Sequence, residues 1–221
     1  MKTILFSKIH QVVLLAFLAA CQSPSGSERL PILGNRHAEE LTVNGRTQTD
    51  TVYHTIADFA FLNQEGDTVS NADVAGKVYV ADFFFTSCPT ICPIMKKEML
   101  RVYEAFKADS DFKILSHTID PEYDTVALLK DYAARLGVEN ADTWNFLTGD
   151  QEKIFEIGQT SYLTTAMSDK NEPGGYLHSG AFVLIDQQGR IRGVYDGTKA
   201  TQVDRLIKDI PKLLALPDES S

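Results

Sequence analysis

The sequence predicts an α/β domain in which a central mixed sheet is flanked by helices. The segment 77–85, KVYVADFFF, is a nearly continuous run of β-branched and aromatic residues, as expected of a strand buried on both faces. Apolar residues then recur at spacings of three and four in PIMKKEMLRVYEAFKA, which predicts an amphipathic helix starting at Pro93. Strands, strand–helix units, a hairpin and a last helix follow one another, which implies parallel crossovers with an antiparallel edge.

Turn and cap residues delimit the other predicted elements. The segment 54–70, HTIADFAFLNQEGDTVS, is typical of two short strands around a turn at 64–67, an N-terminal β-hairpin extension. A second central strand is predicted at 112–120. The remaining elements are a helix at 124–137 capped by Asp124 or Thr125 and stopped by Gly137, a strand in WNFLT, a short helix in DQEKIFEIGQT, a hairpin turned at 187–189, and a terminal helix interrupted by Pro211.

The first 20 residues have the pattern of an export signal. Lys2 and Lys8 precede an apolar stretch of nine residues, and LAAC then ends at Cys21. Nine residues are too few for a membrane-spanning helix, which needs about 20, so a permanent membrane helix is the weaker alternative. LAAC resembles the bacterial lipobox, which implies a lipidated Cys21, a bacterial source and an envelope location; an ordinary signal peptide is the alternative.

Composition divides the rest of the chain. We expect a flexible tether over 21–51, where Ser, Pro, Gly and polar residues prevail. A compact domain over 52–217 and a short tail over 218–221 should follow it. Loss of Lys2 and Lys8 with the signal leaves 19 basic against 30 acidic residues, a net charge of −11. This acidic balance argues against nucleic-acid binding and against electrostatic adhesion to anionic lipid.

Cys88 and Cys92 lie where the buried strand meets the helix that starts at Pro93. A disulfide closing so short a loop would stabilise little, so a structural staple explains the pair poorly. A helix N-terminus favours the thiolate, which is the form that attacks disulfides and the form that binds metal. A structural zinc site needs four ligands, whereas two thiolates with one imidazole suit copper(I).

Three segments together resemble the Sco/SenC family of thioredoxin-fold copper proteins. They are TSCPTICP, TIDPEYDT and the single histidine of YLHSGAFVLIDQQGR. The resemblance implies a thioredoxin-like fold over nearly the whole domain, and a copper site made by Cys88, Cys92 and His178. It also implies delivery of copper to the copper A centre of cytochrome c oxidase. Three residues between the cysteines, where thioredoxins have two, argue against a general disulfide reductase.

The resemblance also suggests partners and leaves alternatives. The expected partners are the oxidase subunit that carries the copper A site, other periplasmic copper chaperones or thiol reductants, and the membrane through the lipid anchor. The main alternative is a thiol–disulfide oxidoreductase that uses Cys88 and Cys92 to keep the target's cysteines reduced. A peroxiredoxin-type peroxidase and a redox or copper sensor are weaker readings, and binding of copper(II) beside copper(I) stays open.

Other polar residues have more ordinary interpretations. We expect His37 and His54 to face solvent and His117 to be a core position within its strand. Asp120 either caps the turn in DPEYDT or lies just outside the ligands and tunes the copper or the thiols. The last predictions are an exposed loop position for Met167 and a solvated helix face for Lys96 and Lys97.

Overall fold

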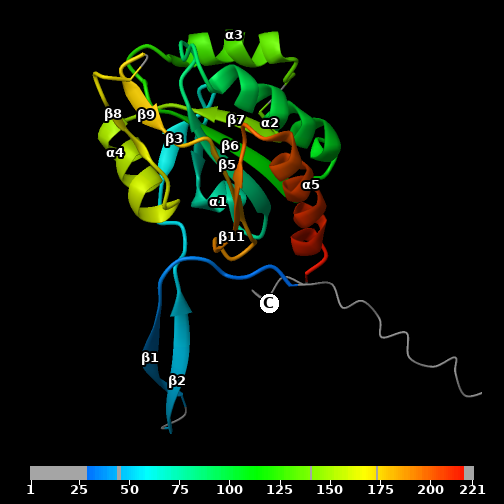
Figure 1. The fold of residues 1–221 in the computed structure, drawn as a ribbon. Coiled ribbons are helices and arrows are strands. Elements are labelled where there is room, and N and C mark those ends of the chain that lie inside the picture. The colour runs from blue at the N-terminus through cyan, green and yellow to red at the C-terminus, as the bar shows by residue number, and fades with distance from the viewer. Residues whose placement is uncertain (1–28, 44–45, 140, 173, 217–221) are drawn as a thin grey trace, which may run out of the picture.

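The computed structural model of the protein describes residues 29–43, 46–139, 141–172 and 174–216 (Figure 1). The predicted signal peptide, Cys21 and the tail at 218–221 lie outside these residues. In the described part the strands are β1 (Arg36–Val43), β2 (Arg46–Tyr53), β3 (Ala60–Leu62), β4 (Thr68–Ser70), β5 (Val78–Phe84), β6 (Phe112–Thr118), β7 (Trp144–Leu147), β8 (Ala166–Ser168), β9 (Tyr176–His178), β10 (Ala181–Ile185) and β11 (Ile191–Asp196). The helices there are α1 (Asn71–Val74), α2 (Cys92–Phe106), α3 (Val126–Leu136), α4 (Gln151–Glu156), a π-helical turn at Ile157–Ser161 and α5 (Ala200–Leu214).

The central sheet has the order β11-β10-β5-β6-β7. β5, β6 and β7 are parallel, while β10 and β11 are antiparallel, which confirms the predicted mixed sheet with an antiparallel edge. Ile185 of β10 pairs with Tyr79 near the start of β5. The turn between β10 and β11 therefore lies at the amino end of β5, and the cysteine loop lies at its carboxyl end.

The two faces of β5 meet different layers. Phe84 stacks on Tyr132 of α3, and the ammonium of Lys96 from α2 lies over the same ring. Phe83, one residue earlier, turns to the other face and packs against Tyr162, just after the π-helical turn. Successive strand residues point to opposite faces, so a strand covered on both sides needs apolar residues at nearly every position.

Cap residues place the helices close to where the sequence predicted them. Thr125 caps α3 through a hydrogen bond from the backbone N–H of Leu128, and Gly137 ends it with a φ of +79°. The strong αL preference of glycine explains this stop. The terminal helix differs from its prediction, because α5 continues across Pro211 to Leu214.

The segment expected to be a flexible tether contains regular structure. β1 and β2 form an antiparallel hairpin that projects from one end of the domain (Figure 1). The overlooked signal is the Asn44–Gly45 dipeptide, which is typical of a two-residue hairpin turn. Further upstream, Leu33 N–H donates to Ile191 O at 2.8 Å, so the chain is held against β11 before the hairpin begins. The smaller β3–β4 hairpin lies where the sequence predicted it.

Candidate metal centre

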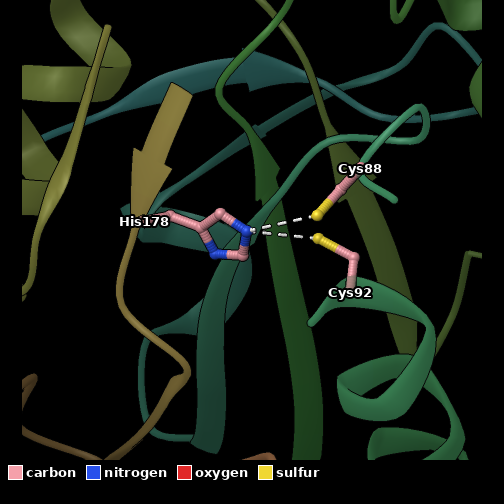
Figure 2. Close-up of side chains that lie close together, drawn as sticks. All are labelled: Cys88, Cys92 and His178. Atoms are coloured by element: carbon pink, nitrogen blue, oxygen red, sulfur yellow. Dashed lines mark hydrogen bonds between the residues drawn. The ribbon is translucent and has the colours of Figure 1, made fainter. Parts of the chain in front are cut away.

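Three side chains converge at the carboxyl end of β5. His178 Nε2 lies 3.2 Å from Cys92 Sγ and 4.0 Å from Cys88 Sγ (Figure 2). The two sulfurs and a ring nitrogen of His178 all lie within 4.8 Å of one another. All three residues are buried and neither cysteine is in a disulfide. A small shift of these side chains would put three donor atoms around one soft metal ion.

The two cysteines come from different local structures. Cys92 is the first residue of α2, and Pro93 follows at the first turn, where the missing N–H costs no hydrogen bond. Cys88 lies before the helix in an irregular loop, and its N–H donates to Phe85 O at 3.2 Å. The loop that carries Cys88 is therefore not helical, yet it brings the two sulfurs close together.

The two thiols differ in acidity. Burial raises the pKa of Cys88, but hydrogen bonds from the Thr90 hydroxyl and from the N–H groups of Cys92 and Thr90 outweigh it, so the net pKa is lowered. Burial raises the pKa of Cys92 far above its ordinary value. Cys88 is thus the thiol that ionises first, and a cation at the centre would be needed to draw the proton from Cys92.

The imidazole of His178 presents a lone pair to the sulfurs. Its Nδ1 lies 3.3 Å from Ser179 O, which can only accept, so Nδ1 carries the proton and Nε2 is free to accept or to coordinate. Burial lowers the pKa of His178, which keeps the ring neutral. A neutral imidazole with a fixed tautomer is the form that binds metal.

Close packing of the β8–β9 segment positions His178. The edge of its ring meets Phe85, with centroids 5.8 Å apart, and Phe85 also packs on Tyr176. Gly174 has a φ of +89°, and a Cβ added there would lie 2.7 Å from the Phe85 ring. Glycine at this position therefore lets the loop approach Phe85 closely enough to bring the histidine over the cysteines.

Asp120 reaches the centre only indirectly. Its carboxylate accepts a hydrogen bond from Oη of Tyr176 at 3.0 Å, and Tyr176 lies two residues before His178. Its backbone O also accepts from the N–H groups of Tyr123 and Asp124, as a turn-forming residue does. The turn role is therefore present in the structure, and tuning of a metal or of the thiols by Asp120 stays a prediction.

Lys96 was predicted to face solvent, and that prediction was wrong. The residue is 2% exposed, one helical turn after Cys92, and its Nζ donates to Asp82 Oδ2 at 2.7 Å and to Ser116 Oγ at 3.0 Å. Buried lysine needs such a partner, because an isolated charge in the core is costly. The sequence feature that could have predicted a buried lysine is Asp82, an acid in the middle of a strand that is otherwise apolar.

Asp124 is a second residue whose role the sequence did not reveal. It was a candidate helix cap, but Thr125 caps the helix, and the buried Asp124 carboxylate binds both Thr86 and Thr118. Thr86 N–H lies 3.1 Å from Asp124 Oδ2. Asp124 thus ties the start of the cysteine loop to the end of β6.

The remaining candidates lie away from the centre. His37 and Met167 are exposed, as predicted, but Met167 lies in β8 and not in a loop. His54 is half-buried, and its Nε2 bonds Ser161 O at 2.7 Å, so it is not a plain solvent residue. His117 is a fully buried core residue, as predicted, and burial lowers its pKa to about 4. Among the described residues no helix is long and apolar enough to cross a membrane.

Comparisons with known proteins agree with this architecture. The SCO1 protein homolog of Bacillus subtilis is 34% identical over 168 residues, 75% of this chain and 86% of the relative. A crystal structure of a SCO1/SenC family lipoprotein from Bacillus anthracis superposes with a TM-score of 0.66 at 32% identity, over 73% of this chain and 95% of that one.

A second solved structure, BsSco, is described as a member of the Sco family of cytochrome c oxidase assembly proteins with a disulfide switch. It superposes with a TM-score of 0.65 at 34% identity, over 74% of this chain and 95% of that one. The family model described as SCO1/SenC matches residues 47–215. With its thioredoxin-like fold and its two cysteines facing one histidine, the chain belongs to the SCO1/SenC family.

Proposed function

We propose that the chain is a copper-binding metallochaperone whose cargo is held by Cys88, Cys92 and His178. The observation that carries the proposal is the convergence of two sulfurs and an unprotonated ring nitrogen within 4.8 Å. Thiolate and imidazole donors favour copper(I), which is stable with three ligands. The described residues place no fourth His, Cys, Asp or Glu in this group, so the donor set suits copper(I) better than structural zinc.

The delivery step follows from the family. The target is the copper A centre of cytochrome c oxidase, and the partner is the oxidase subunit that carries it. Cys88 lies in a loop ahead of the helix, so it is placed to release or accept the ion while Cys92 and His178 still hold it. Copper(I) moves by exchange of thiolate ligands, with no change in oxidation state.

The test is an anaerobic competition titration with a copper(I) chelator. The reduced protein should bind a single copper(I), and the protein oxidised to the Cys88–Cys92 disulfide should bind none, because both anionic donors are consumed. Incubation of the loaded protein with the metal-free copper A domain should then transfer copper, measured by metal analysis after separation. Failure of the reduced protein to compete with the chelator would refute copper binding.

Two free thiols close to one another also support a second candidate, a thiol–disulfide oxidoreductase. The Cys88 thiolate would attack a disulfide of the target, and Cys92 would resolve the mixed disulfide. The target would gain two electrons and two protons, and the chain would keep the new disulfide. His178→Ala separates the two functions, since it should abolish copper transfer but leave restoration of the target's thiols largely intact.

We also propose that the mature protein is a lipoprotein of the bacterial envelope, anchored through Cys21. The support is the LAAC sequence, together with the similarity to a Bacillus lipoprotein. Cys21→Ser should release the domain from the membrane or leave an unprocessed precursor. Membrane fractionation and intact mass measure both results, and a variant that is cleaved and fractionates as the parent does would contradict the anchor.

A further inference from the structure

Basic side chains gather at the end of the domain opposite the metal centre. Two adjoining hollows, of about 380 and 480 Å³, share Arg29, Leu30 and Pro31 in their walls. The basic residues that line them are Arg29, Arg36, Arg190, Arg205, Lys208 and Lys212, which we call the basic end, together with Arg192. The overall balance of 30 acidic and 21 basic residues therefore does not describe this part of the surface, and it does not argue against adhesion of this end to anionic lipid.

Few acids line the two hollows themselves. Asp209 is the acid in the walls of the hollows, and it is held by Lys212 at 2.7 Å and by the hydroxyl of Tyr195. Asp186 is buried and pairs with Arg192 at 2.8 Å. These pairs neutralise Lys212 and Arg192, and the excess positive charge of the basic end is carried by Arg29, Arg36, Arg205 and Lys208. In the sequence, Asp218 and Glu219 follow α5 and lie outside the described residues.

The chain enters the domain at this same end. Arg192 donates to Pro31 O at 3.1 Å and to Leu30 O, while Leu33 N–H donates to Ile191 O. In Figure 1 the first described residues run beside the end of α5, below the sheet, whereas β9 and the start of α2 lie at the other end. The docked segment therefore fixes which end of the domain faces the anchor.

The distance from the anchor is short. Leu30 lies nine residue steps after Cys21, and a fully extended chain spans at most about 3.5 Å per step, which gives a maximum distance of about 30 Å. An anchored domain on so short a connection stays within reach of the lipid headgroups. The end that carries Leu30 is the end held nearest to them.

We propose that the basic end docks on the anionic phospholipid headgroups of the membrane in which the protein is anchored. The inference rests on the proposed anchor at Cys21, and it goes beyond the proposed copper function. Arginine suits this ligand because its planar guanidinium binds phosphate through two parallel hydrogen bonds. Docking directs the metal centre away from the bilayer.

The test is co-sedimentation of the mature chain with vesicles. The mature chain from residue 21 with Cys21→Ser contains every described residue, so it reports the surface without the anchor. It should bind vesicles of phosphatidylcholine with phosphatidylglycerol and should not bind phosphatidylcholine alone, and salt should weaken the binding. Arg205→Gln with Lys208→Gln should weaken it about 25-fold, because each basic residue near an anionic surface contributes about fivefold.

The matched control removes the same charge elsewhere. Lys97→Gln with Lys153→Gln neutralises two exposed basic residues of α2 and α4, and should leave vesicle binding as in the parent. Both double variants should keep the copper(I) affinity of the parent, so loss of docking is measured separately from loss of the copper function. Equal binding to both kinds of vesicle would overturn the proposal, as would equal weakening by the control variant.

Two further outcomes are decisive. Complete competition by millimolar inorganic phosphate would show a site for the free anion and not for a membrane surface. On the lipidated protein, acetylation of Lys208 by an amine reagent should be slower on anionic than on neutral vesicles, while Lys97 should react equally on both. Protection of Lys208 by a soluble acidic protein and not by anionic vesicles would identify a protein partner and refute docking on lipid.

Discussion

His178 and His117 are both buried, yet their surroundings differ in kind. His178 has Cys92 Sγ at 3.2 Å on one ring nitrogen and Ser179 O at 3.3 Å on the other. Neither ring nitrogen of His117 has a hydrogen-bond partner among the described residues. Its ring stacks on Phe83 with centroids 5.0 Å apart, and Phe59, Phe61 and Tyr162 surround it.

The difference follows from where each residue lies in the fold. His117 is in the middle of the central sheet, with Phe83 and Leu147 as its neighbours on the adjacent strands. A side chain there stands perpendicular to the sheet and meets the apolar layer above it. His178 ends the small β8–β9 sheet, which carries it to the cysteine loop. Burial alone therefore does not identify a ligand; the position of other donor atoms does.

The largest expected difference between the two histidines is in copper affinity. His178→Ala should weaken copper(I) binding by more than the 10–100-fold that is typical of losing a group outside the ligands, because a donor atom is removed. His117→Ala should leave the affinity nearly unchanged. Anaerobic competition titrations on the two variants measure both effects, and an equal loss of affinity in the two would show that His178 is no more a ligand than His117 is.

The second expected difference is in acid stability. Burial lowers the pKa of His117 to about 4, below the 6.5 of a free imidazole, so the unfolded chain binds this proton first as the pH falls. The contribution to the free energy of unfolding is fully present above about pH 6.5 and is lost between there and about pH 4. At pH 5 the loss is about 2 kcal/mol.

His117→Phe should remove this loss, because phenylalanine suits the aromatic surroundings and takes up no proton. Urea unfolding at pH 5 and pH 7 should show a smaller difference between the two pH values for the variant than for the parent. The copper titration of the same variant is the control. An unchanged pH dependence would mean that His117 does not carry the effect.

The smallest expected effect is a difference in reactivity between the two cysteines of the metal centre. Hydrogen bonds lower the pKa of Cys88, whereas burial raises that of Cys92, so Cys88 holds more thiolate at neutral pH. Alkylation at pH 7 should be about tenfold or more faster in Cys92→Ser, which keeps Cys88, than in Cys88→Ser. Faster labelling of the remaining Cys92 would reverse the assignment of the attacking thiol.

Local patterns in the sequence determined most of the domain. The run 77–85, the helical spacing after Pro93 and the stop at Gly137 predicted β5, α2 and α3 correctly. These features depend on neighbours within a few residues, because periodicity, caps and turns are local properties of the backbone. The motif segments also identified the cysteines and the histidine that the fold brings together, although 86 residues separate Cys92 from His178.

Only the tertiary structure decided what depends on distant partners. The sequence around Lys96 is that of an exposed helix lysine. In the folded chain Lys96 pairs with Asp82 of β5, and it can be buried because its counter-charge is buried beside it. The β1–β2 hairpin is an intermediate case, because the Asn44–Gly45 dipeptide is typical of a hairpin turn but its strands show no apolar alternation. The basic end cannot be recognised in a sequence with a net charge of −9, because it joins Arg29 and Arg36 with residues of the β10–β11 hairpin and of α5. Charge along a sequence can be counted, but charge on a surface exists only after the chain has folded.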